Sequence, residues 1–270
     1  MSSIQPLIIT ATPNICWLQP GVPYPDTSED MAVEAELCAD AGAAVLHMHA
    51  DGRWAESIKA VRARTDLVVQ CGMSSLSLEK RLDVFRTRAD EISVILGHHD
   101  EAFVELDVYE LHPRDELIRY CRASNEYGVR LEFEVWNTGH IWNLEWLAAR
   151  DSLAPPYITT LFFGWPGGTW SPPTVREYLY RRENMPAGSV ITVSTMGPEQ
   201  LAIMSAAIAS GDHVRVGTED YPRDRSGRVV RTHELVREAK ELAQAMGREV
   251  ATPAQARELR GLPARRASIS

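Results

Sequence analysis

The chain has few cysteines, no long apolar run and no basic leader, and each absence excludes a class of protein. Its 270 residues include four cysteines, none in a CxxC spacing. This pattern is typical of reduced thiols rather than of a disulfide framework or a zinc ribbon. No apolar run reaches the roughly 18 residues that span a bilayer, and no basic stretch precedes an apolar run at the start of the sequence. We therefore expect a cytoplasmic protein with no membrane partner.

Positive charge is also scarce. Lys and Arg number 28 against 37 Asp and Glu, so the formal net charge is −9. Binding to nucleic acid needs a positive surface field, and the sequence offers none. Hydrophobic residues make up 44% of the chain, which is ample for a globular core. The partners that this composition favours are small molecules.

Eight short apolar or β-branched runs recur along the chain, separated by helix-like segments and turns. They are Leu7–Thr10, Ala44–His49, Leu67–Cys71, Ile92–Leu96, Val129–Trp136, Ile158–Gly164, Val190–Met196 and His213–Gly217. Parallel strands joined by helices form a closed barrel or an open doubly wound sheet. The first run is followed by no GxGxxG turn, and roughly 250 residues suit a barrel. The sequence thus predicts a single-domain (β/α)₈ TIM barrel over residues 1–270, with a C-terminal helical tail from about residue 252.

The second run ends in His47 and His49, which are two residues apart. Side chains alternate along a strand, so both imidazoles face the same way, at the strand end where such barrels hold their active sites. Two imidazoles on one face make half of a metal site. Histidines packed or hydrogen-bonded in the core remain the alternative.

The eighth run supplies three more candidates. Arg215 and Glu219 share a face with Gly217 between them, and Asp220 follows. Strand 2 and strand 8 both neighbour strand 1, so Glu219 is expected to meet both histidines in a His₂Glu set typical of catalytic zinc. Asp220 would then be free to act as a base oriented by Arg215. A surface pair of acidic residues that caps the next helix is the alternative.

The fifth and sixth runs end in further candidates. Glu132, Glu134 and Trp136 share a face, and buried carboxylates need partners or a solvated site. Glu134 is expected to reach the barrel mouth, whereas a structural ion pair is favoured for Glu132. Gly167 and Gly168 follow the sixth run, where glycines would let backbone amides approach a ligand. A plain turn is the alternative there.

These motifs together resemble those of the β-keto acid cleavage enzymes, also known from the 3-keto-5-aminohexanoate cleavage enzyme. The resemblance runs from about Leu7 to Leu259. The segments that carry it include His47-x-His49, Glu134-Val135, Gly164-x-Pro166-Gly167-Gly168 and Gly211-x-His213-Val214-Arg215-Val216-Gly217-x-Glu219-Asp220. Members of this family are zinc-dependent barrels. They convert a 3-keto acid and acetyl-CoA into acetoacetate and a new acyl-CoA.

The resemblance implies a role for each candidate. Zn²⁺, or another divalent metal, would bind to His47, His49 and Glu219, and Asp220, positioned by Arg215, would remove the substrate C2 proton. Glu134 would face the distal end of the substrate or hold the side chains that surround the metal site. Acetyl-CoA would be the co-substrate, and a homotetramer is expected. The residues expected to contact the 3-keto acid are Ser74, Trp136, Gly167 and Gly168.

The chain also departs from the family pattern. The acidic residue usual after strand 1 is missing from the segment Asn14–Trp17, which disfavours a cationic amino substrate. Val94 and Leu96 are expected where the family carries a polar pair, and with the tryptophans they favour an apolar or bulky acyl group. Arg223, Arg225 and Arg228 could contact CoA phosphates, although a solvated loop is favoured for them.

Two rival functions remain open at this point. A metal-dependent hydrolase is disfavoured because barrels of that kind carry histidines on strands 5 and 6, and this chain has none there. A metal-binding barrel that has lost its activity is the other alternative, because the pocket turns differ from the family pattern.

Overall fold

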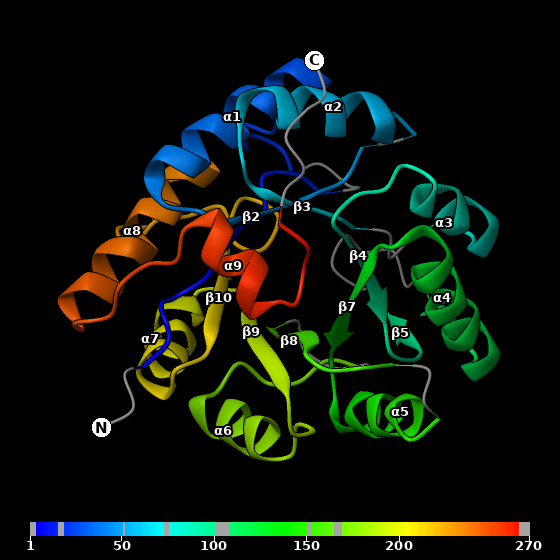
Figure 1. Cartoon of the computed structure of the whole chain (residues 1–270). Helices are drawn as coiled ribbons and strands as arrows, with labels where there is room; N and C mark the ends of the chain where they lie inside the picture. Colours follow the sequence, from blue (N-terminus) through cyan, green and yellow to red (C-terminus); the bar gives the residue numbers. More distant parts are fainter. Residues whose placement is uncertain are drawn as a thin grey trace.

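Eight parallel strands close into a barrel, and helices form an outer ring around it (Figure 1). The computed structural model describes residues 4–15, 19–50, 52–72, 76–100, 109–150, 153–164 and 169–264. The barrel strands are β1 (Ile9–Ala11), β2 (Val45–Met48), β3 (Val68–Cys71), β4 (Glu91–Ile95), β7 (Arg130–Val135), β8 (Tyr157–Gly164), β9 (Ser189–Met196) and β10 (His213–Val216). Each of the eight predicted runs overlaps one of them, and the strand ends differ from the predicted ends by one or two residues in most cases. The predicted TIM barrel is therefore confirmed.

Nine helices lie in the part of the chain that the structure describes. They are α1 (Ser28–Ala41), α2 (Trp54–Arg64), α3 (Leu78–Phe85), α4 (Arg114–Tyr127), α5 (Thr138–Ala148), α6 (Val175–Glu183), α7 (Gln200–Ser210), α8 (Thr232–Ala245) and α9 (Pro253–Leu259). The helix α1 begins with a capping box between Thr27 and Asp30 and ends at Gly42 in the left-handed region, as such cap residues dictate. Within these described segments, no helix is long and apolar enough to cross a membrane.

Side-chain alternation divides the strands into two faces. One face packs outward against the helices in the main apolar core, which includes Val94 and Leu96. The other face points into the barrel, where Ser93 contacts His47 and Ile95 packs beside Trp136. The expectation that Val94 and Leu96 line the pocket was wrong by one residue, and such a shift moves a side chain to the opposite face of a strand.

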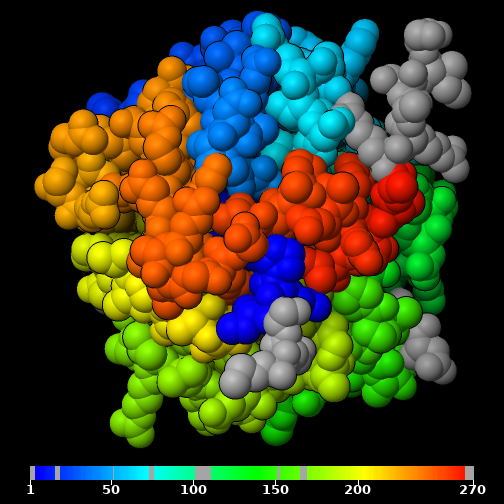
Figure 2. All heavy atoms as spheres, turned by 60° about the vertical axis from the view of Figure 1, so that its left-hand side comes forward, coloured from blue at the N-terminus to red at the C-terminus, as the bar shows by residue number. Residues whose placement is uncertain are grey.

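The C-terminal segment closes the end of the barrel where the strands begin. There α9 lies across the barrel interior (Figure 1), and Arg260 just beyond it forms a buried ion pair with Glu91 at the start of β4. Figure 2 shows the N-terminal residues beside this segment. Leu7 pairs with Val250, donating its N–H to Glu249 at 2.7 Å and accepting from Ala251 at 2.8 Å. The opposite end of the barrel therefore remains for the site.

A small antiparallel hairpin that the sequence analysis did not predict follows β4. It pairs β5 (His99–Asp100) with β6 (Tyr109–Glu110). The ring of His99 stacks on that of His112 at 5.1 Å and meets Trp136 edge-on at 4.7 Å. The hairpin therefore supports the barrel mouth at the ends of β4 and β7.

Candidate metal centre and active site

His47, His49 and Glu219 meet at the mouth of the barrel, on β2 and on the turn after β10. The Nε2 atom of His47 lies 3.6 Å from Oε2 of Glu219, and Nε2 of His49 lies 3.3 Å from Oε1. One ligand atom from each residue falls within a common span of 4.8 Å, and all three side chains are buried. The geometry thus brings the three predicted ligands together.

The space in front of these atoms is kept open by Gly72. A Cβ at this position would lie 2.6 Å from Nε2 of His47 and 2.7 Å from Nε2 of His49. Any larger residue would fill the volume toward which both nitrogens point. Two imidazoles and one carboxylate around a small open volume fit a divalent metal with a free coordination position.

Hydrogen bonds orient the imidazole of His47. Its Nδ1 lies 2.7 Å from Oε1 of Gln70, and because an amide oxygen can only accept, Nδ1 carries the proton. The Gln70 amide donates in turn to Glu91 at 2.7 Å, and Arg260 holds Glu91 by two contacts of 2.6 Å. A buried chain of four side chains thus leaves the Nε2 lone pair of His47 facing Glu219, as a metal ligand requires.

Main-chain contacts fix His49. The Asn14 side chain accepts from the His49 N–H at 3.0 Å and donates to the His49 carbonyl at 2.7 Å. Glu219 is held by Thr12, whose hydroxyl donates to Oε2 and whose carbonyl accepts from the Glu219 N–H. A Cβ at Gly217 would lie 2.1 Å from the Thr12 carbonyl oxygen, so glycine is needed for this close approach of β10 to β1.

The charges of the centre suit a bound cation. Burial lowers the pKa of His47 to about 3, and Arg215 adds to this effect, so the imidazole is neutral and its lone pair is available. Burial alone would raise the pKa of Glu219, but Arg215 and the two histidines hold that pKa well below its usual value. Neutral imidazoles and an ionised carboxylate are the forms that bind metals.

Asp220 lies beside the centre in a fixed orientation. Arg215 contacts it through Nε at 3.0 Å and through the terminal nitrogen at 2.8 Å, and the Ser194 hydroxyl donates to it at 2.8 Å. The same guanidinium contacts Glu219 at 2.6 Å. Burial raises the pKa of Asp220, while Arg215 opposes the rise. A carboxylate of raised pKa is a stronger base than an ordinary one.

A hollow of about 300 Å³ opens next to Asp220, between the turns that follow β9 and β10 and the segment after β1. Tyr221, Arg223 and Met196 line it together with Asp220. Arg223 donates to the Gly227 carbonyl, whereas Arg225 and Arg228 form ion pairs with acidic residues on the protein itself. These pairs fit the solvated-loop alternative for Arg225 and Arg228.

Glu134 and Trp136 lie across the mouth from the histidines. The indole Nε1 of Trp136 donates to Glu134 at 3.3 Å. Burial raises the pKa of Glu134 to about 8, and the neighbouring charge of Glu132 adds to the rise. Near neutral pH the Glu134 carboxyl is therefore mainly protonated. Glu132, expected to form an ion pair, instead lies deeper in the barrel, where burial raises its pKa.

Some expected contacts lie outside the described residues, namely those of Ser74, Gly167 and Gly168. Conversely, the sequence analysis assigned no role to Gln70, Ser194 or Asn14, which orient the histidines and Asp220. For Gln70 a signal existed, because an amide inside an apolar strand must find a partner when it is buried.

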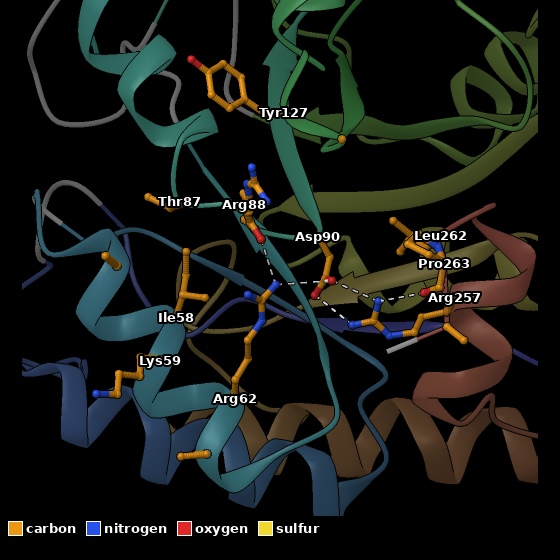
Figure 3. A pocket seen from close by; sticks show the side chains of 15 residues that line it. Ile58, Lys59, Arg62, Thr87, Arg88, Asp90, Tyr127, Arg257, Leu262 and Pro263 are labelled. Atoms are coloured by element: carbon orange, nitrogen blue, oxygen red, sulfur yellow. Dashed lines mark hydrogen bonds and ion pairs between the residues drawn. The ribbon is translucent and has the colours of Figure 1, made fainter. Parts of the chain in front are cut away.

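A larger hollow, of about 930 Å³, lies at the opposite end of the barrel. Asp90 is one of the residues that line it, and Figure 3 shows this side chain between Arg62 from α2 and Arg257 from α9. The ion-pair distances are 3.4 Å to Arg62 and 2.9 Å to Arg257. These contacts tie both helices to the start of β4, so we assign them a structural role.

Comparisons with known proteins identify the family of the chain. The sequence matches the family described as beta-keto acid cleavage enzyme over residues 6–262. It is 31% identical to the 3-keto-5-aminohexanoate cleavage enzyme of Acetoanaerobium sticklandii, over 96% of this chain and 99% of that protein. It is 27% identical to the 3,5-dioxohexanoate:acetyl-CoA acetone transferase of Paraburkholderia graminis, over 96% of each chain.

The fold comparison gives a consistent result. The apo structure of ObcA superposes with a TM-score of 0.74 at 20% identity, covering 88% of this chain. This chain spans 65% of the length of ObcA, and the likeness concerns the fold alone. From the family match and the curated relatives together, we conclude that the chain belongs to the beta-keto acid cleavage enzyme family.

Proposed function

We propose that the protein is a metal-dependent enzyme that converts a 3-keto acid and acetyl-CoA into acetoacetate and the acyl-CoA of the remaining group. The observation that carries this proposal is the meeting of His47, His49 and Glu219 beside the Arg215–Asp220 pair. The family match and the acetyl-CoA named for the Paraburkholderia graminis relative support it.

The residues have separate roles in this proposal. His47, His49 and Glu219 would hold a divalent metal, most simply zinc, which would supply Lewis acidity to substrate oxygens. Asp220 accepts the proton from C2, and the guanidinium of Arg215 keeps the Asp220 carboxylate aimed at that carbon. Protonated Glu134 can donate a hydrogen bond to a substrate oxygen, which an ionised carboxylate could not do.

The reaction needs no reactant other than the 3-keto acid and acetyl-CoA. The C2 carbanion forms a bond to the acetyl carbonyl carbon of acetyl-CoA, and the CoA sulfur leaves as a thiolate. The thiolate then attacks the original C3 carbonyl, the C2–C3 bond breaks, and the proton held by Asp220 returns to C2. The products are acetoacetate and the CoA thioester of the acyl group that consists of C3 and its substituent.

The test combines metal content with turnover. Wild type, His49→Ala and Asp220→Asn are purified, their bound metals are quantified, and each is incubated with acetyl-CoA and a panel of 3-keto acids. We expect metal in wild type and in Asp220→Asn, but acyl-CoA and acetoacetate only from wild type. Release of acid without consumption of acetyl-CoA would instead favour a hydrolase. Bound metal without any product would contradict the proposal.

A further inference from the structure

The barrel mouth is divided into a charged half and an apolar half. The charged half carries the candidate metal centre, on β2 and β10. The apolar half is a cluster at the ends of four neighbouring strands, which we name the aromatic wall. Its members are Ile95, Trp136, Phe162 and Trp170, with Met196 packed against them. The ring centroids of Trp136 and Trp170 are 4.1 Å apart, and those of Trp136 and Phe162 are 5.7 Å apart.

The aromatic wall lies next to the residues proposed to carry out the reaction. The guanidinium carbon of Arg215 lies 5.0 Å from the ring centroid of Phe162, and the same guanidinium contacts Glu219 and Asp220. A 3-keto acid held at the metal centre by its carboxylate and keto oxygens has one group left to place, the substituent on C3. The contact between Phe162 and Arg215 places the wall next to the groups that would hold such a substrate.

Two arginine side chains, Arg215 and Arg181, flank the aromatic wall. In front, the Arg215 guanidinium covers Phe162. Behind it, the buried Arg181 donates to the carbonyls of Phe162, at 2.8 Å, and of Val135, and lies over the Phe163 ring at 4.5 Å. Aromatic faces attract cations, but here a guanidinium already covers Phe162. The ring of Phe162 is therefore already in contact with a cation of the protein.

Two carboxyl groups border the wall, and both are already engaged. Glu134 accepts from the Trp136 indole at 3.3 Å. Asp100, beside Trp170, accepts from the N–H and the hydroxyl of Thr169 at 3.3 and 3.2 Å. Both carboxyl groups thus already accept from hydrogen-bond donors, which a charged substituent would have to displace.

We propose that this enzyme selects 3-keto acids whose C3 substituent is neutral and apolar, with Trp136, Phe162 and Trp170 as the specificity-determining residues. The inference rests on the proposed function and adds the substrate class to it. Each methylene group that the wall removes from water would raise kcat/KM about fourfold. An ammonium or carboxylate group against the same rings would lose its hydrating water, and the two indole N–H groups already donate to Glu134 and to the Asp100 carbonyl.

Three synthetic keto acids separate the effect of charge from the effect of size. They are 5,5-dimethyl-3-oxohexanoate, its cationic isostere 3-oxo-4-(trimethylammonio)butanoate, and 3-oxohexanedioate, whose tail is anionic. We expect kcat/KM with acetyl-CoA to be at least about 100-fold higher for the neutral compound than for either charged one. Binding of each compound to the metal-loaded enzyme is measured in parallel by tryptophan fluorescence without acetyl-CoA, and the same order is expected.

One variant in the aromatic wall and one matched surface variant test whether the wall causes the preference for an apolar substituent. Trp170→Leu shortens the wall, whereas Trp142→Leu makes the same change on the surface of α5, where Trp142 is 77% exposed. We expect Trp170→Leu to lower the preference for 5,5-dimethyl-3-oxohexanoate over 3-oxopentanoate by about tenfold, mainly through KM. Trp142→Leu should leave this ratio unchanged.

The outcomes separate this inference from the proposed function. Equal or better turnover of the cationic isostere would overturn the inference while leaving the acetyl-CoA reaction established. Preferential binding of the neutral compound without turnover of any would support the wall and contradict the reaction. Failure of the neutral compound to bind more tightly than the charged ones would overturn the inference whatever the turnover.

Discussion

The Nδ1 atom of His47 lies 2.7 Å from Oε1 of Gln70, and this contact determines which imidazole nitrogen faces Glu219. We expect Gln70→Met, a change of similar volume, to weaken divalent metal affinity by about 10–100-fold, because the imidazole loses its fixed tautomer and orientation. Competition with a chelating indicator measures the affinity. Gln244→Leu, on the exposed face of α8, is the control. Unchanged affinity in Gln70→Met would show that Gln70 does not orient the ligand.

Gly72 gives a second test of the centre. We expect Gly72→Ala to lose most of its metal, because the added Cβ would lie within 2.7 Å of both Nε2 atoms. Metal content after dialysis is the measurement. A thermal unfolding curve of the metal-free variant, compared with that of metal-free wild type, distinguishes loss of the site from loss of the fold. A variant that binds metal as tightly as wild type would place the ion elsewhere.

The ion pair between Arg260 and Glu91 makes a prediction about stability. Both side chains are at most 1% exposed. We expect Arg260→Met to lower the free energy of unfolding by roughly 3–5 kcal/mol, because it leaves the Glu91 carboxylate buried without its cation. The double variant Arg260→Met with Glu91→Gln should recover part of this loss. Urea denaturation measures all three proteins, and a single variant as stable as wild type would contradict the expectation.

Glu134 makes a prediction about pH. Its pKa is about 8 in the folded protein, against an ordinary value of 4.5, so between these values the folded chain holds a proton that the unfolded chain has released. Rising pH therefore favours unfolding across this window. We expect metal-free wild type to lose on the order of 2–4 kcal/mol more than Glu134→Gln between about pH 5 and pH 8.5. Parallel pH profiles of the two proteins would contradict this.

Sequence reasoning predicted the three candidate ligands because they depend on two local rules. Alternation along β2 puts His47 and His49 on one face, and closure of the barrel brings the end of β10 close to β2 through β1. The same reasoning misassigned the inward face of β4, because nothing within a short apolar run fixes which of two alternating faces points inward.

The support of His47 could not be predicted in the same way. Gln70, Glu91 and Arg260 come from β3, from the start of β4 and from the residue after α9, and 169 residues separate Glu91 from Arg260. In the sequence, Arg260 stands in an arginine-rich stretch that is typical of a solvated surface. Only the docking of α9 across the barrel shows that it is buried.

The division of the mouth also has an evolutionary consequence. The groups proposed for metal binding and proton transfer lie on β2 and around β10, whereas the aromatic wall lies at the ends of β4, β7, β8 and β9 and contacts Arg215 through Phe162. A gene duplicate could therefore exchange Trp170 and acquire a new substrate in a few steps, while the proposed metal ligands and base stay unchanged at every intermediate. Within one barrel, the residues proposed to select the substrate are thus distinct from those proposed to carry out the reaction.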